Sequence, residues 1–156
     1  MRLSALSLFC FALGVLLAGC ETESSGIQRA RLLQRSAITR EPPGNYFIGR
    51  RYYNSYYKFW GYIRSPGQPW ATSQLVMLNE KQKLAPDREI NQIGVDDNCE
   101  YRLYGHFTGD KVYEPASNHQ YPEFLLERYE LIDRNPPSIF PPGARLQSTE
   151  IAKPEN

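Results

Sequence analysis

The stretch EYRLYGHFT, residues 100–108, decides the fold. Its apolar members Tyr101, Leu103 and Phe107 occupy alternate positions, and polar or charged residues fill most of the positions between them. An alternation with a period of two predicts a β-strand that is buried on one face. Gly105 interrupts the apolar set in mid-strand, at a position where a barrel strand can bend sharply.

Further strands are expected on both sides of this stretch. Each is rich in apolar and aromatic residues and is bounded by Gly, Pro or Asn. Gly61 interrupts the first of them as Gly105 interrupts the third, and Gly109-Asp110 is expected to turn the chain. The apolar face of the last strand changes parity after Leu126, which predicts a bulge. The expected strands are residues 56–64, 74–79, 100–108, 112–113 and 123–132.

The predicted fold class is therefore all-β, as a small five-stranded barrel. Closure is expected because short strands in an open sheet would leave exposed edges. The layout resembles an OB-fold over residues 46–133. The helix that an OB-fold carries between strands three and four has no counterpart in residues 111–122, which are rich in Pro and Asn, so an SH3-like barrel stays open as the alternative.

The start of the chain has the features of a secretory signal. Arg2 is followed by an uncharged apolar run from Leu3 to Ala18, which is shorter than the about 20 residues of a membrane-spanning helix. Leu17-Ala18-Gly19-Cys20 then resembles the lipobox of bacterial lipoproteins. The resemblance implies cleavage before Cys20 and acylation of its thiol, so that the chain is held on a membrane.

The same resemblance carries expectations about location. An envelope protein anchored through Cys20 is implied, on the outer membrane if the source has one, since Glu21 stands where enteric lipoproteins retained in the inner membrane carry Asp. Only Cys99 would remain as a thiol, so no internal disulfide is expected.

Four segments are expected along the chain. A polar tether follows the signal and ends at Pro42-Pro43-Gly44, with a weakly amphipathic helix expected over residues 27–39. The tail from Pro141 is poor in large apolar residues and is expected to be loose. The boundaries are a signal at 1–19, a lipidated tether at 20–44, the barrel at 45–140 and the tail at 141–156.

Charge is unevenly distributed although the chain is formally close to neutral, with 18 basic and 17 acidic residues. Residues 27–64 contain eight basic residues against Glu41 alone. This basic part adjoins the expected anchor, and basic residues next to an anionic membrane surface contribute on the order of 1 kcal/mol each. A solvated tether without a specific contact is the alternative.

Catalytic and metal-binding motifs are absent from the sequence, so an enzyme is not expected and no cofactor is predicted. His106 and His119 lack the close spacing of metal ligands. Cys99 has no catalytic motif, and Asp96 and Asp97 would raise the pKa of its thiol. A hydrolase that uses the loop carboxylates Asp96, Asp97 and Glu100 remains the alternative function, because such groups meet only in space.

A binding surface is expected on one face of the first strand. Tyr57, Phe59, Gly61 and Ile63 would face the core, and the opposite, aromatic and basic face would meet solvent. On OB-folds such aromatics stack ligands and basic residues hold anions. Because exported proteins rarely meet nucleic acid, the expected partners are a glycan, an anionic lipid or an envelope protein; a structural envelope component is the competing hypothesis. The alternative for the residues themselves is that they are half-buried strand residues covered by the tether or a loop. The candidate ligand-binding residues are Tyr56, Lys58, Trp60, Tyr62 and Arg64.

Overall fold

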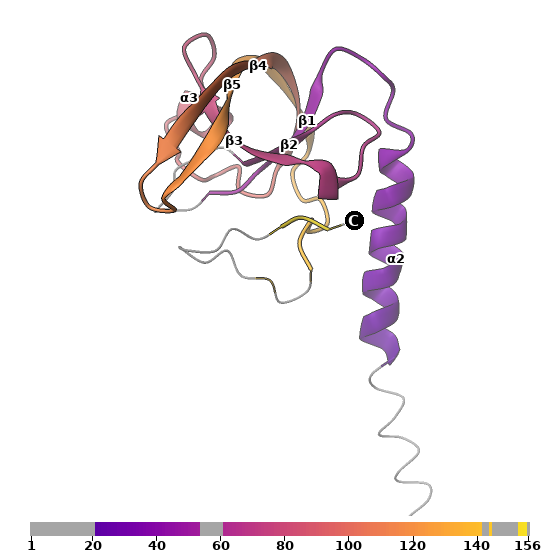
Figure 1. The fold of residues 1–156 in the computed structure, drawn as a ribbon. Coiled ribbons are helices and arrows are strands. Elements are labelled where there is room, and N and C mark those ends of the chain that lie inside the picture. Colours follow the sequence, from indigo (N-terminus) through magenta and orange to yellow (C-terminus); the bar gives the residue numbers. More distant parts are fainter. Residues whose placement is uncertain (1–20, 54–60, 142–143, 145–152, 156) are drawn as a thin grey trace, which may run out of the picture.

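The computed structural model describes residues 21–53, 61–141, 144 and 153–155. Its centre is a closed barrel with the strand order β1-β2-β3-β5-β4 (Figure 1). The all-β, five-stranded barrel that the sequence predicts is confirmed. The strands are β1 (Phe47–Arg51), β2 (Gly61–Arg64), β3 (Gln74–Asn79), β4 (Glu100–Glu114) and β5 (His119–Asp133).

The barrel closes because β1 pairs antiparallel with both β2 and β4. On the other side β3 pairs antiparallel with β2 and parallel with β5, where Met77 lies opposite Glu123. The β4–β5 hairpin forms the longest ladder. Closure leaves no free edge around this ring of strands, which removes the risk of edge-to-edge association.

Two mid-strand glycines permit the tight curvature. Gly61 has φ of 140°, and a Cβ there would lie 2.2 Å from the carbonyl oxygen of Arg50. Gly105 has φ of 149°, and its Cβ would lie 2.0 Å from the carbonyl oxygen of Leu125. Neighbouring backbones thus come too close for any side chain.

The predicted bulge in the last strand is confirmed. Tyr104 lies opposite Arg128 and Gly105 opposite Leu126, so Glu127 is an additional residue in β5. An extra residue in one strand shifts the side chains that follow to the other face. Tyr129 therefore packs against the barrel core together with Leu126.

The strands differ from expectation at two places. β1 was not predicted, and residues 112–113 belong to β4, which passes Gly109-Asp110 through a register irregularity. The hairpin turn comes later, between Glu114 and His119. Residues 111–122 contain no helix, as expected, because they form the end of β4, the turn and the start of β5. The short helix α3 (Pro86–Glu89) lies instead between β3 and β4, in the segment 80–98 for which no regular element was expected.

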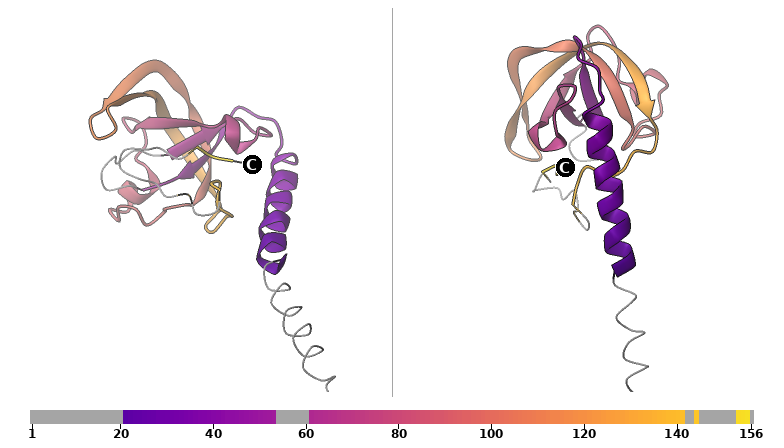
Figure 2. Two further views of the ribbon diagram at one scale, coloured as in Figure 1. Left: turned by 60° about the horizontal axis from the view of Figure 1, so that its bottom comes forward. Right: turned by 90° about the vertical axis from the view of Figure 1, so that its right-hand side faces the viewer.

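Helix α2 (Glu21–Ile38) covers the tether region and is longer than the expected helix at 27–39. It leads away from the barrel, and its C-terminal end joins β1 through the Pro-Pro-Gly segment (Figure 2). No helix in the described ranges has the length and apolarity needed to cross a membrane.

The interior of the barrel is one apolar core. Ile63, Val76, Leu103, Phe124 and Leu126 are buried in it. Phe107, predicted to face inward, packs edge-on against Phe124 and Phe47, whose ring centroids lie 5.3 and 5.6 Å away. The matching prediction for Phe59 lies outside the described residues.

A second core covers the outside of β1 and β2. Ile48 and Tyr62 point outward from the two strands, and Trp70 of the 3-10 helix η1 (Trp70–Thr72) packs over them. Ile38 from the end of α2 and Ile139 from the C-terminal segment complete this outer core. Both faces of β1 and β2 are consequently buried.

Candidate functional site

The outward face of β2 is not open to a ligand. Tyr62, a member of the outer core, is only 4% exposed, and Arg64 is only 3% exposed. These two residues are therefore covered, as the alternative interpretation expected, and do not form part of a solvated binding surface. The alternation of the strand correctly predicts that both side chains point out of the barrel. Ile38, Trp70 and Ile139, from other parts of the chain, then cover this face. Tyr56, Lys58 and Trp60, like Cys20, lie outside the described residues.

The two described arginines of this face, Arg50 and Arg64, have partners within the fold. The guanidinium carbons of Arg50 and Arg64 lie 5.2 and 4.4 Å from the ring centroid of the fully buried Trp70. Arg50 also forms an ion pair with Glu100 at 2.5 Å and donates to Asn98 Oδ1 and the carbonyl of Pro137. Of the groups that suggested ligand binding, Tyr62 and Arg64 thus take part in the outer core and its contacts.

One end of the barrel is closed by a buried ionic cluster. Arg51 points to Asp87 of α3, at 2.5 Å, and to Asp96, at 3.0 Å. Asp87 also accepts a hydrogen bond from the backbone N–H of Gly94 at 2.9 Å. Arg51 belongs to β1, whereas Asp87 and Asp96 lie in α3 and in the loop that follows it. The cluster therefore fixes the loop between α3 and β4 on the barrel.

This fixed loop presents apolar side chains to solvent. Ile90, Ile93 and Val95 are 56%, 57% and 57% exposed. The ring of Tyr53 lies against Gly94, which stands between Ile93 and Val95 in the chain, since a Cβ on Gly94 would meet this ring at 3.0 Å. We call Tyr53, Ile90, Ile93 and Val95 the apolar barrel end. Exposed apolar side chains that gather in a contiguous patch are one of the surface features found at interaction sites.

Sequence reasoning missed the apolar barrel end because the stretch from Glu80 to Asn98 is mostly polar. The available signal was local: Ile90, Ile93 and Val95 surround Gly94 in a segment that has no strand or helix period. Large apolar residues in such a loop have no local core to enter.

The carboxylates considered for hydrolysis all have structural partners. Asp96 faces Arg51, Glu100 pairs with Arg50, and Asp97 accepts the backbone N–H of Tyr53 at 2.8 Å. Burial raises the pKa of Asp96, an effect that Arg51 partly offsets. Burial first, and then Asp96, raises the pKa of the Cys99 thiol, so the predicted direction at Cys99 is confirmed.

The two histidines lie at different levels of the β4–β5 hairpin. His106 is opposite Leu125 and approaches Glu127 at 3.3 Å, whereas His119 is opposite Glu114 near the turn. Among the residues that the structure describes, no three His, Cys, Asp or Glu side chains are grouped as metal ligands would be.

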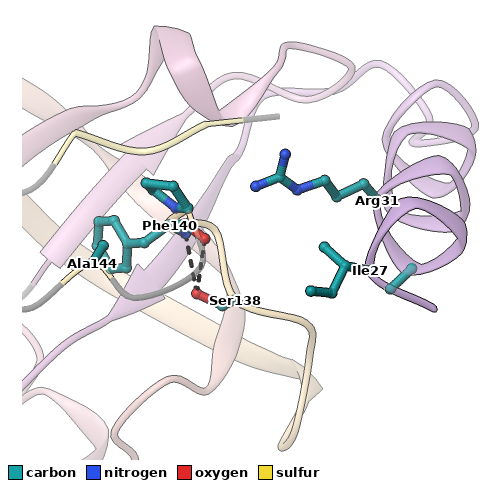
Figure 3. Close-up of a pocket in the computed structure, with 7 residues that line it drawn as sticks. Ile27, Arg31, Ser138, Phe140 and Ala144 are labelled. Carbon is teal, nitrogen blue, oxygen red and sulfur yellow. Dashed lines mark hydrogen bonds between the residues drawn. The ribbon is translucent and has the colours of Figure 1, made fainter. Parts of the chain in front are cut away.

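A cleft of about 370 Å³ separates α2 from the C-terminal segment. Figure 3 shows Ile27 and Arg31 extending from the helix towards Ser138 and Phe140. Arg31 pairs with Glu155 at 3.3 Å, and the N–H of Glu155 donates to the carbonyl of Ile139. The described part of the predicted loose tail thus joins helix and barrel, and the cleft is lined by both apolar and polar side chains.

Comparison of the chain with models of known families, with curated proteins and with solved structures gave no significant match.

Proposed function

We propose that this protein is a lipid-anchored component of the cell envelope whose barrel binds another envelope protein through the apolar barrel end. The signal-like start and the Leu17-Ala18-Gly19-Cys20 motif support the anchor. The barrel is a non-catalytic module in this proposal.

The exposure of Ile90, Ile93 and Val95 carries the binding part of the proposal. Burying such side chains in an interface is favourable at roughly 25 cal/mol per Å² of apolar surface. The contacts of Asp87 hold the loop before any partner arrives, and preorganisation lowers the cost of binding. A protein partner with an apolar pocket fits this surface better than a glycan, which needs polar groups.

The segment that follows Tyr53 in the sequence is a second candidate for contacts with a partner. Residues 54–60, NSYYKFW, connect β1 to β2 and follow Tyr53 directly. The strand order, the parallel β3–β5 pair and the position of α3 support an OB-like topology, in which the β1–β2 connection contributes to binding. Tyr56, Lys58 and Trp60, which lie outside the described residues, therefore remain candidate contacts in this proposal.

The position of the apolar barrel end suits a partner away from the anchor. In Figures 1 and 2, α3 lies on the side of the barrel opposite α2. Because α2 follows Cys20 in the chain, a protein held at Cys20 would present this end away from its own attachment point.

Replacing Cys20 by Ala tests the anchor. The variant should lack acylation and either accumulate as the unprocessed precursor or become soluble, because two or three acyl chains are needed for stable attachment. Mass spectrometry of the membrane and soluble fractions measures both. A Cys20→Ala protein that fractionates with membrane at the mature size would contradict the anchor.

Site-specific photo-crosslinking in living cells tests the binding surface. A photoreactive residue at position 93 should give a discrete adduct with one protein, and the same group at exposed Glu127 should not. Ile90→Glu should abolish the adduct formed from position 93. Equal adducts from positions 93 and 127, or none from position 93, would support the structural-component hypothesis instead.

A further inference from the structure

Helix α2 has an outer face that the barrel does not cover. Ile38 is buried in the outer core, and Ala30 and Arg31 turn towards the C-terminal segment. Leu32 and Leu33, by contrast, are 64% and 62% exposed. In a helix, residues three and four apart share a face, so Arg29 lies on the same outer face as both leucines.

This part of the chain is also strongly basic. Arg29, Arg31, Arg35 and Arg40 follow one another between Ser24 and Arg40 with no acidic residue among them. The acidic residues that flank this stretch are Glu23 and Glu21 at the start of the helix and Glu41, which is bound by Arg64. Exposed leucines beside several arginines are typical of helices that lie in the interface of an anionic bilayer.

We propose that the outer face of α2 binds the surface of an anionic phospholipid bilayer, with Leu32 and Leu33 in the interface and Arg29 next to a lipid phosphate. The complementary charge and the exposed leucines favour a lipid surface over a second protein. The proposal deepens the proposed anchoring, since it gives α2 an orientation on the same membrane, but it does not require acylation.

The geometry gives the contact a consequence for the barrel. The bidentate pair between Arg64 and Glu41 and the burial of Ile38 join the end of α2 to the barrel. A helix lying on the bilayer therefore positions the barrel above it. An 18-residue helix standing upright would instead hold the barrel about 27 Å from the membrane.

Vesicle sedimentation of a non-acylated protein tests this proposal. The protein is the chain from residue 20 with Cys20→Ser, which contains every residue of both cores. It should bind vesicles of phosphatidylcholine with 30% phosphatidylglycerol and bind pure phosphatidylcholine much more weakly. Binding should be largely lost when the salt concentration is raised to about 1 M, where screening extends to about 3 Å.

Matched variants distinguish the face of α2 from general stickiness. Leu32→Ser with Leu33→Ser should weaken binding about tenfold, and Arg29→Gln about fivefold. Leu84→Ser and Lys81→Gln, at exposed positions next to the barrel, should leave it unchanged, and circular dichroism shows that each variant is folded. Failure of the non-acylated protein to bind, or equal effects of both sets, would overturn the proposal. Neither result depends on whether Cys20 is acylated.

Discussion

Arg64 donates from both terminal nitrogens to the two carboxylate oxygens of Glu41, at 2.7 and 2.6 Å. The side chain of Arg64 is fully buried and that of Glu41 is 17% exposed. Glu41 also accepts the backbone N–H of Gly67 at 2.8 Å. One carboxylate in the tether therefore links the helix, β2 and the turn that follows it.

Replacing Glu41 by Ala should lower the free energy of unfolding by about 3 kcal/mol, because a buried guanidinium would lose its counter-ion. Chemical denaturation measures the loss. Glu155→Ala is the matched control, since it removes an ion pair with Arg31 whose partners are 35% and 52% exposed. That loss should stay below about 1 kcal/mol. Equal losses would mean that Glu41 does not hold the tether on the barrel.

Replacing Trp70 by Ala should cost about 3–5 kcal/mol, because a fully buried indole in the outer core would leave a cavity. Arg50 and Arg64 would also lose the ring over which they lie. Tyr113→Ala removes an aromatic side chain that is 55% exposed and should cost under about 1 kcal/mol. A small effect at Trp70 in thermal and urea denaturation would contradict the outer core.

Replacing Gly105 by Ala should destabilise the barrel by more than about 3 kcal/mol, because the new methyl group would overlap the carbonyl of Leu125. Gly67 also has a positive φ, of 72°, but a Cβ there meets nothing within 4 Å. Gly67→Ala should therefore cost only about 1–2 kcal/mol, the backbone contribution alone. Similar values at the two positions would show that close approach of β4 and β5 does not limit residue 105.

The stability conferred by Asp96 should depend on pH. Because burial raises its pKa in the folded protein, the native state binds its proton more tightly than the unfolded chain does. Stability attributable to Asp96 is then greatest below the unfolded pKa of about 3.9 and falls as the pH rises above it. Relative to Asp96→Asn, the native protein should lose stability between pH 4 and pH 7 in urea titrations. A difference that is constant or grows with pH would contradict this sign.

Part of the fold follows from local pattern. Residues 74–79 form β3 as predicted, and the parity change after Leu126 located the bulge, because alternation records which face of a strand is buried. β1 was missed, although it lies within the predicted barrel segment, because Phe47–Arg51, FIGRR, contains two adjacent arginines and lacks the apolar alternation of the other strands. Those arginines are buried only because Glu100 and Asp87 arrive from distant parts of the chain.

By itself the sequence determined the all-β class, the bend glycines and the alternation of β2 and β4, since these depend on neighbours a few residues apart. Only the tertiary structure decided that Tyr62 and Arg64 are buried. Their cover consists of Ile38, Trp70 and Ile139, which come from before and after the strand. The same holds for Ile90, Ile93 and Val95, whose exposure depends on Arg51 and Asp87 fixing their loop outside both cores. Alternation predicts to which side of a strand a residue points, whereas exposure depends on what the rest of the chain packs against that side.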